Sequence, residues 1–110
     1  MWIFLSNSFL SITDEGEPGG ASLLVLAWNK DDITAIFPGA GVVEDEPCKG
    51  AFRARIERRV VFEVIADRIE SLHYPDLLAS VRDCERRNRY REVWQIMEGR
   101  RAAKPGKEGL

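Results

Sequence analysis

The chain has 110 residues, 45% of them apolar and 31% charged, and a formal net charge of −2. These values indicate one soluble globular domain with a core of its own and exclude a disordered chain. Two cysteines are too few for a disulfide-stabilised secreted scaffold of this size, so we expect reduced thiols in a cytoplasmic protein.

The apolar start of the chain predicts strands rather than a targeting or membrane segment. It lacks the basic region of a signal peptide, and no stretch approaches the ~20 apolar residues of a membrane span. WIFLSNSFLSIT, residues 2–13, predicts a strand, a tight turn and a second strand, with a single bent strand as the alternative. The acidic segment 14–20 predicts a loop, and the apolar run 22–28 predicts a buried strand.

Residues 29–39 predict one short helix, because their apolar residues recur at helical spacing. Asp31 or Asp32 is expected to cap its free N–H groups, and Pro38-Gly39 ends it.

Strand periodicity follows the short helix. Residues 41–46 predict a short strand, which is followed by a loop. Residues 51–57 alternate apolar and charged side chains, the period of a strand with one face in water. Arg53 and Arg55 share that wet face.

Helical spacing returns after residue 57. Apolar residues recur at intervals of four and three from Val61 to Leu72 and predict an amphipathic helix over 58–73. Pro75 ends it, because proline disfavours helical conformation at the residue before it.

Asp76 can cap a further helix, whose apolar pattern lapses over residues 85–89. Either this helix breaks near Asn88 or it continues with a fully exposed turn, and we favour a break with Asn88 as the new cap. The pattern then resumes as Tyr90, Val93, Trp94 and Met97.

The element order is strands, a short helix, strands and then helices. This order favours an α+β fold: a small antiparallel sheet with helices packed on one face, and a helical C-terminal half. We expect a single α+β domain over residues 1–98 and a flexible C-terminal tail over 99–110.

Residues that could carry out chemistry are few. The single histidine, His73, stands at the expected end of a helix, where it meets the helix dipole. Cys48, His73 and Cys84 match no zinc-site spacing, and the chain has neither a P-loop nor a GxGxxG motif. We expect no catalytic residue, no metal and no cofactor, and therefore no enzyme.

The charges are unevenly distributed along the chain. Residues 1–57 hold nine acids and four bases, a net charge of −5, and residues 58–110 hold nine acids and twelve bases, a net charge of +3. Arginine suits docking to an acidic protein, because its planar guanidinium makes paired bonds to carboxylates. Nucleic-acid binding and a merely solvated helix surface are the alternatives. The candidate partner-binding arginines are Arg53, Arg55, Arg86, Arg87, Arg89 and Arg91.

Three consecutive acids, Glu44, Asp45 and Glu46, form a second candidate partner-binding surface. They could also bind a hard cation, or form an acidic strand edge that discourages pairing with another sheet.

Four stretches, MWIFLSNSFLSI, FPGA, RARI and YPDL…YREVW, resemble a family of short bacterial proteins without an established activity. Its members open with a Met-aromatic-aliphatic-Phe run and FLSI, and end near Tyr-x-x-Val-Trp. The resemblance covers residues 1–98 and implies no catalytic residues. Small proteins of this type are similar to those found near phage and other mobile elements, some of which are anti-CRISPR inhibitors.

We therefore expect a non-enzymatic binding protein that inhibits or modulates a larger host protein or ribonucleoprotein complex by steric occlusion, with an anti-CRISPR inhibitor as the specific hypothesis. The alternative is a small RNA- or DNA-binding accessory protein that uses the C-terminal arginines. A third hypothesis is a self-assembling module that uses an exposed strand edge. We expect no membrane partner, and the sequence leaves the partner and the oligomeric state open.

Overall fold

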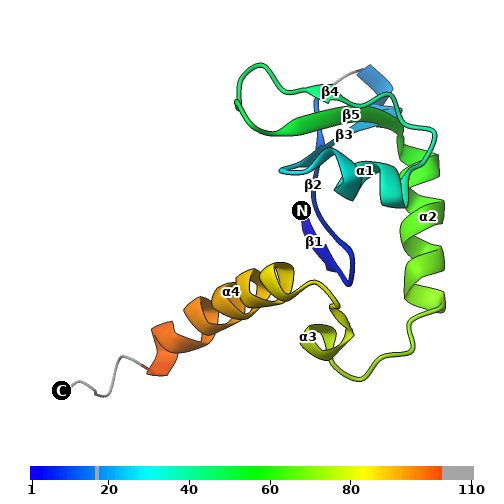
Figure 1. Cartoon of the computed structure of the whole chain (residues 1–110). Helices are drawn as coiled ribbons and strands as arrows, with labels where there is room; N and C mark the ends of the chain where they lie inside the picture. The colour runs from blue at the N-terminus through cyan, green and yellow to red at the C-terminus, as the bar shows by residue number, and fades with distance from the viewer. Residues whose placement is uncertain (17, 103–110) are drawn as a thin grey trace. The chain divides into compact units, whose positions relative to one another are not determined.

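The computed structural model of the chain describes residues 1–16 and 18–102 (Figure 1), and the side chains of residues 1–16 and 18–99. The chain divides into two compact units, residues 1–73 and residues 74–110. The first unit has an α+β fold, and the second is built from helices over its described residues.

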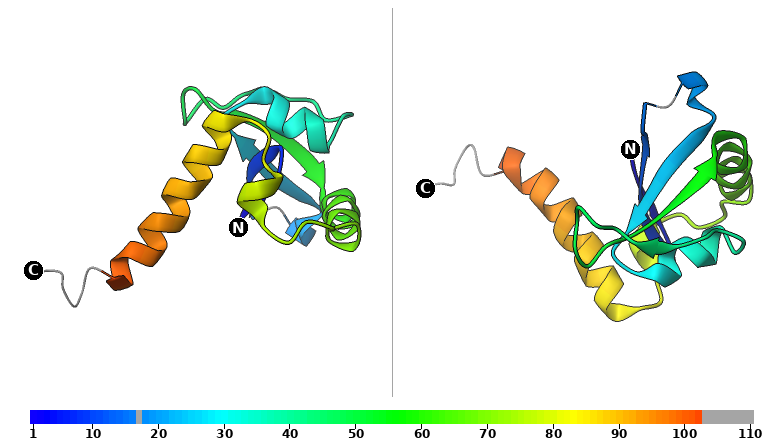
Figure 2. Two further views of the ribbon diagram at one scale, coloured as in Figure 1. Left: turned by 60° about the horizontal axis from the view of Figure 1, so that its bottom comes forward. Right: turned by 90° about the horizontal axis from the view of Figure 1, so that it is seen from above.

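Residues 1–73 contain a five-stranded antiparallel sheet in the order β1-β2-β3-β5-β4 (Figures 1 and 2). The predicted strand, turn and strand at the start of the chain are confirmed, because β1 and β2 pair as a hairpin. A short 3-10 helix, η1 (Pro18–Gly20), lies within the predicted loop before β3. The strands are β1 (Trp2–Leu5), β2 (Ser8–Asp14), β3 (Ser22–Ala27), β4 (Val43–Glu44) and β5 (Phe52–Glu57).

The core of this unit lies between the sheet and two helices, α1 (Lys30–Ile36) and α2 (Arg58–Glu70). Side chains alternate between the two faces of a strand, so buried residues at every second position share one face. Both helices contribute to that same face, α1 through Ile33 and Ile36, and α2 through Val61. The predicted fold class, an antiparallel sheet with helices on one face, is therefore confirmed. The sheet contributes Leu10, Ile12, Leu23, Val25, Ala27, Ala54 and Ile56 to this core.

The start of α1 differs from the prediction. Asn29 occupies the N-cap position, so the expected cap at Asp31 or Asp32 is wrong. Asp32 is instead buried, and its carboxylate accepts a hydrogen bond of 2.9 Å from the Phe9 backbone N–H. Its carboxylate thus connects α1 to the β1–β2 hairpin, a role that the local sequence gives no means to predict.

The end of α2 also differs slightly. The helix ends at Glu70 with Ser71 as its C-cap, before the expected end at His73. The Ser71 backbone N–H and hydroxyl both donate to the Asp67 carbonyl, at 3.0 Å and 2.9 Å, and fix the end of the helix.

Residues 74–102 form two helices, α3 (Leu77–Ser80) and α4 (Cys84–Ala102). The expected break near Asn88 is wrong, because the helices separate at residues 81–83 and Asn88 lies inside α4. Asp83 caps α4 instead: its carboxylate accepts a hydrogen bond of 2.8 Å from the Arg86 N–H. Residues 99–102 of the expected tail are helical, and residues 103–110 lie outside the described part of the chain.

Candidate interaction surfaces

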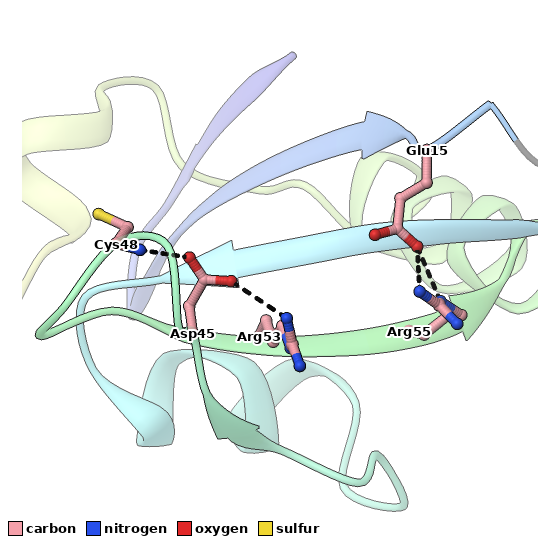
Figure 3. A network of polar contacts seen from close by, with 5 residues as sticks. All are labelled: Glu15, Asp45, Cys48, Arg53 and Arg55. Carbon is pink, nitrogen blue, oxygen red and sulfur yellow. Dashed lines mark hydrogen bonds and ion pairs between the residues drawn. The ribbon is translucent and has the colours of Figure 1, made fainter.

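The three consecutive acids do not form one surface. Glu44 and Glu46 are exposed, whereas Asp45 is buried. The Asp45 carboxylate accepts a hydrogen bond of 3.0 Å from the Cys48 N–H and lies 3.6 Å from the Arg53 guanidinium (Figure 3). Asp45 therefore stabilises the turn between β4 and β5, which leaves only its two neighbours as exposed acids.

Arg53 and Arg55 lie on the face of the sheet opposite α1 and α2, as the alternation in β5 predicts. Arg53 pairs with Asp45, as described above. Two nitrogens of the Arg55 guanidinium lie 2.7 Å and 2.6 Å from one carboxylate oxygen of Glu15 (Figure 3). Both guanidinium groups are thus held over the sheet by carboxylates from other parts of this unit.

The arginines of α4 make local contacts within their own unit. Arg86 donates to the Tyr90 hydroxyl at 3.1 Å, and two nitrogens of Arg87 donate to the Val81 carbonyl at 3.1 Å and 2.7 Å. Arg89 lies 2.9 Å from Glu85. Arg91 donates to the Asn88 side-chain oxygen at 3.0 Å. Among these contacts, the Arg89–Glu85 pair offsets one positive charge, and the others occupy guanidinium N–H groups that phosphates would otherwise bind.

The structure adds an aromatic cluster on the same sheet face as Arg53 and Arg55. The rings of Trp2 and Phe9 meet edge to face at 5.6 Å, and the Phe4 and Phe9 rings lie 4.6 Å apart between centroids. Trp2 is 67% exposed, whereas both phenylalanines are half-buried.

Strand register connects this cluster to Arg53 and places Arg55 in the next row. Trp2 pairs with Ser11, Ser11 with Leu26 and Leu26 with Arg53, which makes one row across four strands. A second row joins Thr13, Leu24 and Arg55. We define the outer sheet face as Trp2, Phe4, Phe9, Leu24, Leu26, Arg53 and Arg55.

Local sequence patterns contain only a weak signal for this face. Both faces of the N-terminal hairpin carry apolar side chains, so its alternation does not tell which aromatic residues lie away from the core. To predict this face, one would also have to know which strands are neighbours in the sheet.

An apolar groove lies along α2 in the same unit. It has a volume of about 820 Å³. Phe62 and Ile69 are 59% and 66% exposed there. A shallower hollow continues along the helix and includes Glu63, Asp67 and Glu70. We define the α2 groove by its apolar lining: Met1, Leu23, Val61, Phe62, Ile65, Ala66 and Ile69.

A third exposed apolar surface lies on the C-terminal half of α4. Trp94 and Met97 are 66% and 71% exposed, and Val93 is 37% exposed. We call these three residues the α4 stripe. The buried Tyr90 precedes them at helical spacing, so the predicted apolar face of this segment is covered only at its first position.

The described residues contain neither a membrane-crossing helix nor a metal-site cluster. None of the helices described is long and apolar enough to cross a membrane. In the same part of the chain, no three His, Cys, Asp or Glu side chains are grouped so that they could hold a metal ion.

Comparisons with known proteins give no relative on which a function could be based. No protein-family model matches the chain, and neither a curated protein nor a solved structure matches it.

Proposed function

We propose that this protein is a non-enzymatic binding protein that covers a surface of a larger protein or ribonucleoprotein complex, and so inhibits or modulates that complex by steric occlusion. The observation that supports this proposal is the outer sheet face, where Trp2 of an aromatic cluster shares a row with Arg53 and Arg55 lies in the next row. Aromatic residues and arginine are enriched at the centres of protein interfaces, where a few of them supply most of the binding energy.

The outer sheet face is also preorganised. Its residues lie on strands of one sheet rather than on loops, and Asp45 and Glu15 hold the two arginines in place. Because less side-chain freedom is lost when a partner binds to an ordered surface, more of the contact energy appears as affinity.

The charge of this unit favours a protein partner over a nucleic acid. Residues 1–73 hold twelve acids and seven bases, a net charge of −5. Affinity for nucleic acid comes mainly from cations that neutralise phosphates, and an acidic unit opposes that attraction.

The specific form of this proposal is an anti-CRISPR inhibitor that acts in the cytoplasm. Its support is the resemblance of the sequence to short proteins found near mobile elements. The two free, exposed cysteines, Cys48 and Cys84, agree with a reducing compartment.

The second candidate function is RNA or DNA binding through the second unit. Residues 74–110 hold six acids and nine bases, a net charge of +3, and α4 carries an exposed Trp94 on which a base could stack. The local bonds of Arg86, Arg87, Arg89 and Arg91 weigh against it, because phosphate groups would have to compete with them.

Affinity capture from a nuclease-treated host lysate tests the main proposal. The wild-type chain, Trp2→Ala and Ile96→Ala serve as baits, and mass spectrometry measures recovery. Trp2 and Ile96 are similarly exposed, at 67% and 69%, but Ile96 lies on α4, outside the outer sheet face. We expect a stoichiometric protein complex with the wild type and Ile96→Ala, and its loss with Trp2→Ala.

The Kd values of the wild type and Trp2→Ala for the purified partner then give the loss of binding free energy. Truncation of a central interface tryptophan weakens binding by about 2 kcal/mol or more, which is about 30-fold in Kd. Recovery that disappears after nuclease treatment, together with affinity that falls steeply with salt, would instead support the nucleic-acid candidate.

A further inference from the structure

One row of the outer sheet face continues across all five strands. Val43 of β4 pairs with Arg53, and this pair extends the row that begins at Trp2 and passes through Ser11 and Leu26. Directly opposite residues on neighbouring strands share one face, and four strand spacings make the row about 19 Å long. Its end residues, Trp2 and Val43, are 67% and 53% exposed. The row therefore offers apolar contact across the whole width of the sheet.

The two arginines of this face are paired with carboxylates of the same chain. Two nitrogens of Arg55 lie 2.7 Å and 2.6 Å from one oxygen of Glu15, whose side chain is 28% exposed. Arg53 lies 3.6 Å from the carboxylate of Asp45, which is buried in the β4–β5 turn (Figure 3). These four side chains together carry no net formal charge. Glu57, at the end of the same strand, lines the α2 groove.

The Glu15 carboxylate affects which kind of surface can cover Arg55. Removing a guanidinium group from water is costly unless an anion or another acceptor is paired with it, so an unpaired arginine would require that group from the partner. Arg55 already has the carboxylate of Glu15, so a neutral partner surface can cover the pair. An incoming anion would instead meet the negative charge of Glu15 beside the guanidinium and would have to displace it.

We propose that Glu15 determines the specificity of the outer sheet face. It supplies the counter-charge of Arg55 from within the chain, so the face binds a neutral, apolar protein surface and disfavours surfaces that place carboxylates or phosphates on Arg55. Specificity of this kind depends on repulsion of the wrong partner as well as on attraction of the right one. The inference rests on the proposed function for the existence of a partner, but the role of Glu15 can be measured on this chain alone.

Titrations of the full-length protein with two matched probes test this role. N-acetyl-leucinamide and N-acetyl-leucine have the same apolar side chain, and only the second carries a carboxylate. Nuclear magnetic resonance follows the indole N–H of Trp2 and the Nε–H groups of Arg53 and Arg55, and gives a Kd for each probe. We expect the amide to bind the wild type more tightly than the carboxylate, by about twofold or more. Equal or tighter binding of the carboxylate, or no response of these signals to the amide, would overturn the proposal.

Glu15→Gln removes the negative charge and keeps a side-chain oxygen that can accept a hydrogen bond from Arg55. This variant is expected to bind the carboxylate probe about two- to fivefold more tightly, the factor that corresponds to one ion pair at the surface, and to bind the amide as the wild type does. Glu63→Gln is the matched control, because Glu63 pairs with Arg59 at 3.4 Å on α2, outside the outer sheet face. An unchanged Kd in Glu15→Gln, or the same gain in Glu63→Gln, would refute the assignment to Glu15.

The partner captured through the outer sheet face gives a second test. A neutral partner surface leaves the Glu15 carboxylate on Arg55, so Glu15→Gln is expected to change the Kd of that partner by less than about twofold. A gain of about two- to fivefold would mean that the partner brings an anion to Arg55, and would contradict the proposal. Failure to capture any partner would reject the proposed function alone, since the probe titrations would still decide the role of Glu15.

Discussion

Arg87→Ala is predicted to destabilise the start of α4, whereas Arg89→Ala is predicted to leave it nearly unchanged. The two arginines lie two positions apart, but their contacts differ. Two nitrogens of Arg87 donate to the carbonyl of the fully buried Val81, across the break between α3 and α4. Arg89 is 69% exposed and pairs with Glu85, which is 74% exposed.

The expected losses of stability follow from the environments of the two arginines. A hydrogen bond with a charged donor contributes about 1.5–3 kcal/mol, and the half-buried position of Arg87 lowers this to about 1–2 kcal/mol. An exposed pair one helical turn apart contributes about 0.3–0.5 kcal/mol. Local opening near Val81 should therefore increase about 5- to 30-fold in Arg87→Ala and about twofold in Arg89→Ala.

Hydrogen exchange measured by mass spectrometry on the full-length protein checks this difference. Peptides that cover residues 77–95 report on the second unit, and peptides from β3 serve as the internal control. Equal loss of protection in the two variants would refute the role assigned to the Arg87–Val81 contact. The expected difference would also mean that weaker partner binding by an Arg87 variant has to be corrected for its lower stability.

Three further substitutions test the other assignments. Asp45→Ala removes the partner of the Cys48 N–H and is expected to lower the free energy of unfolding by about 1–3 kcal/mol in urea titrations, whereas Glu44→Ala should change it by less than about 0.5 kcal/mol. Ile33→Ala empties a fully buried core position and should lower it by about 2–5 kcal/mol; a loss below about 1 kcal/mol would contradict the packing of α1 on the sheet. Trp2→Ala should shift the thermal midpoint by less than about 4 °C, because most of the ring is in water, and a larger shift would mean that Trp2 is a core residue.

Much of the secondary structure could be predicted because local patterns carry it. The alternation in residues 51–57 identifies β5 and the face on which Arg53 and Arg55 lie. The apolar residues that recur at helical spacing from Val61 to Leu72 identify α2, although not its last residue. Helix boundaries were less accurate, because a cap depends on which side chain turns back toward the helix end: Asp83 caps α4, and Asn88 does not.

The candidate surfaces were less predictable than the elements. The sequence pointed to charged residues, but the pairing of Arg55 with Glu15 joins residues forty positions apart and cannot be read from local spacing. The burial of Asp45 beside exposed neighbours depends in the same way on the turn in which it lies. The α2 groove forms where Met1, Leu23 and the helix meet, and these segments are distant in the sequence.

By itself, the sequence determined the α+β class, the strand hairpin at its start and the apolar faces of its helices, because periodicity and turn residues act over a few neighbouring positions. Only the tertiary structure decided that β3 pairs with β5, since alternation shows which face a side chain occupies but not which strand lies beside it. That pairing places Arg53 and Arg55 in rows with Leu26 and Leu24, and the row of Arg53 continues through β2 to Trp2 of the hairpin. The outer sheet face is therefore a product of long-range strand order, which is set by the burial of the whole core and not by any one segment.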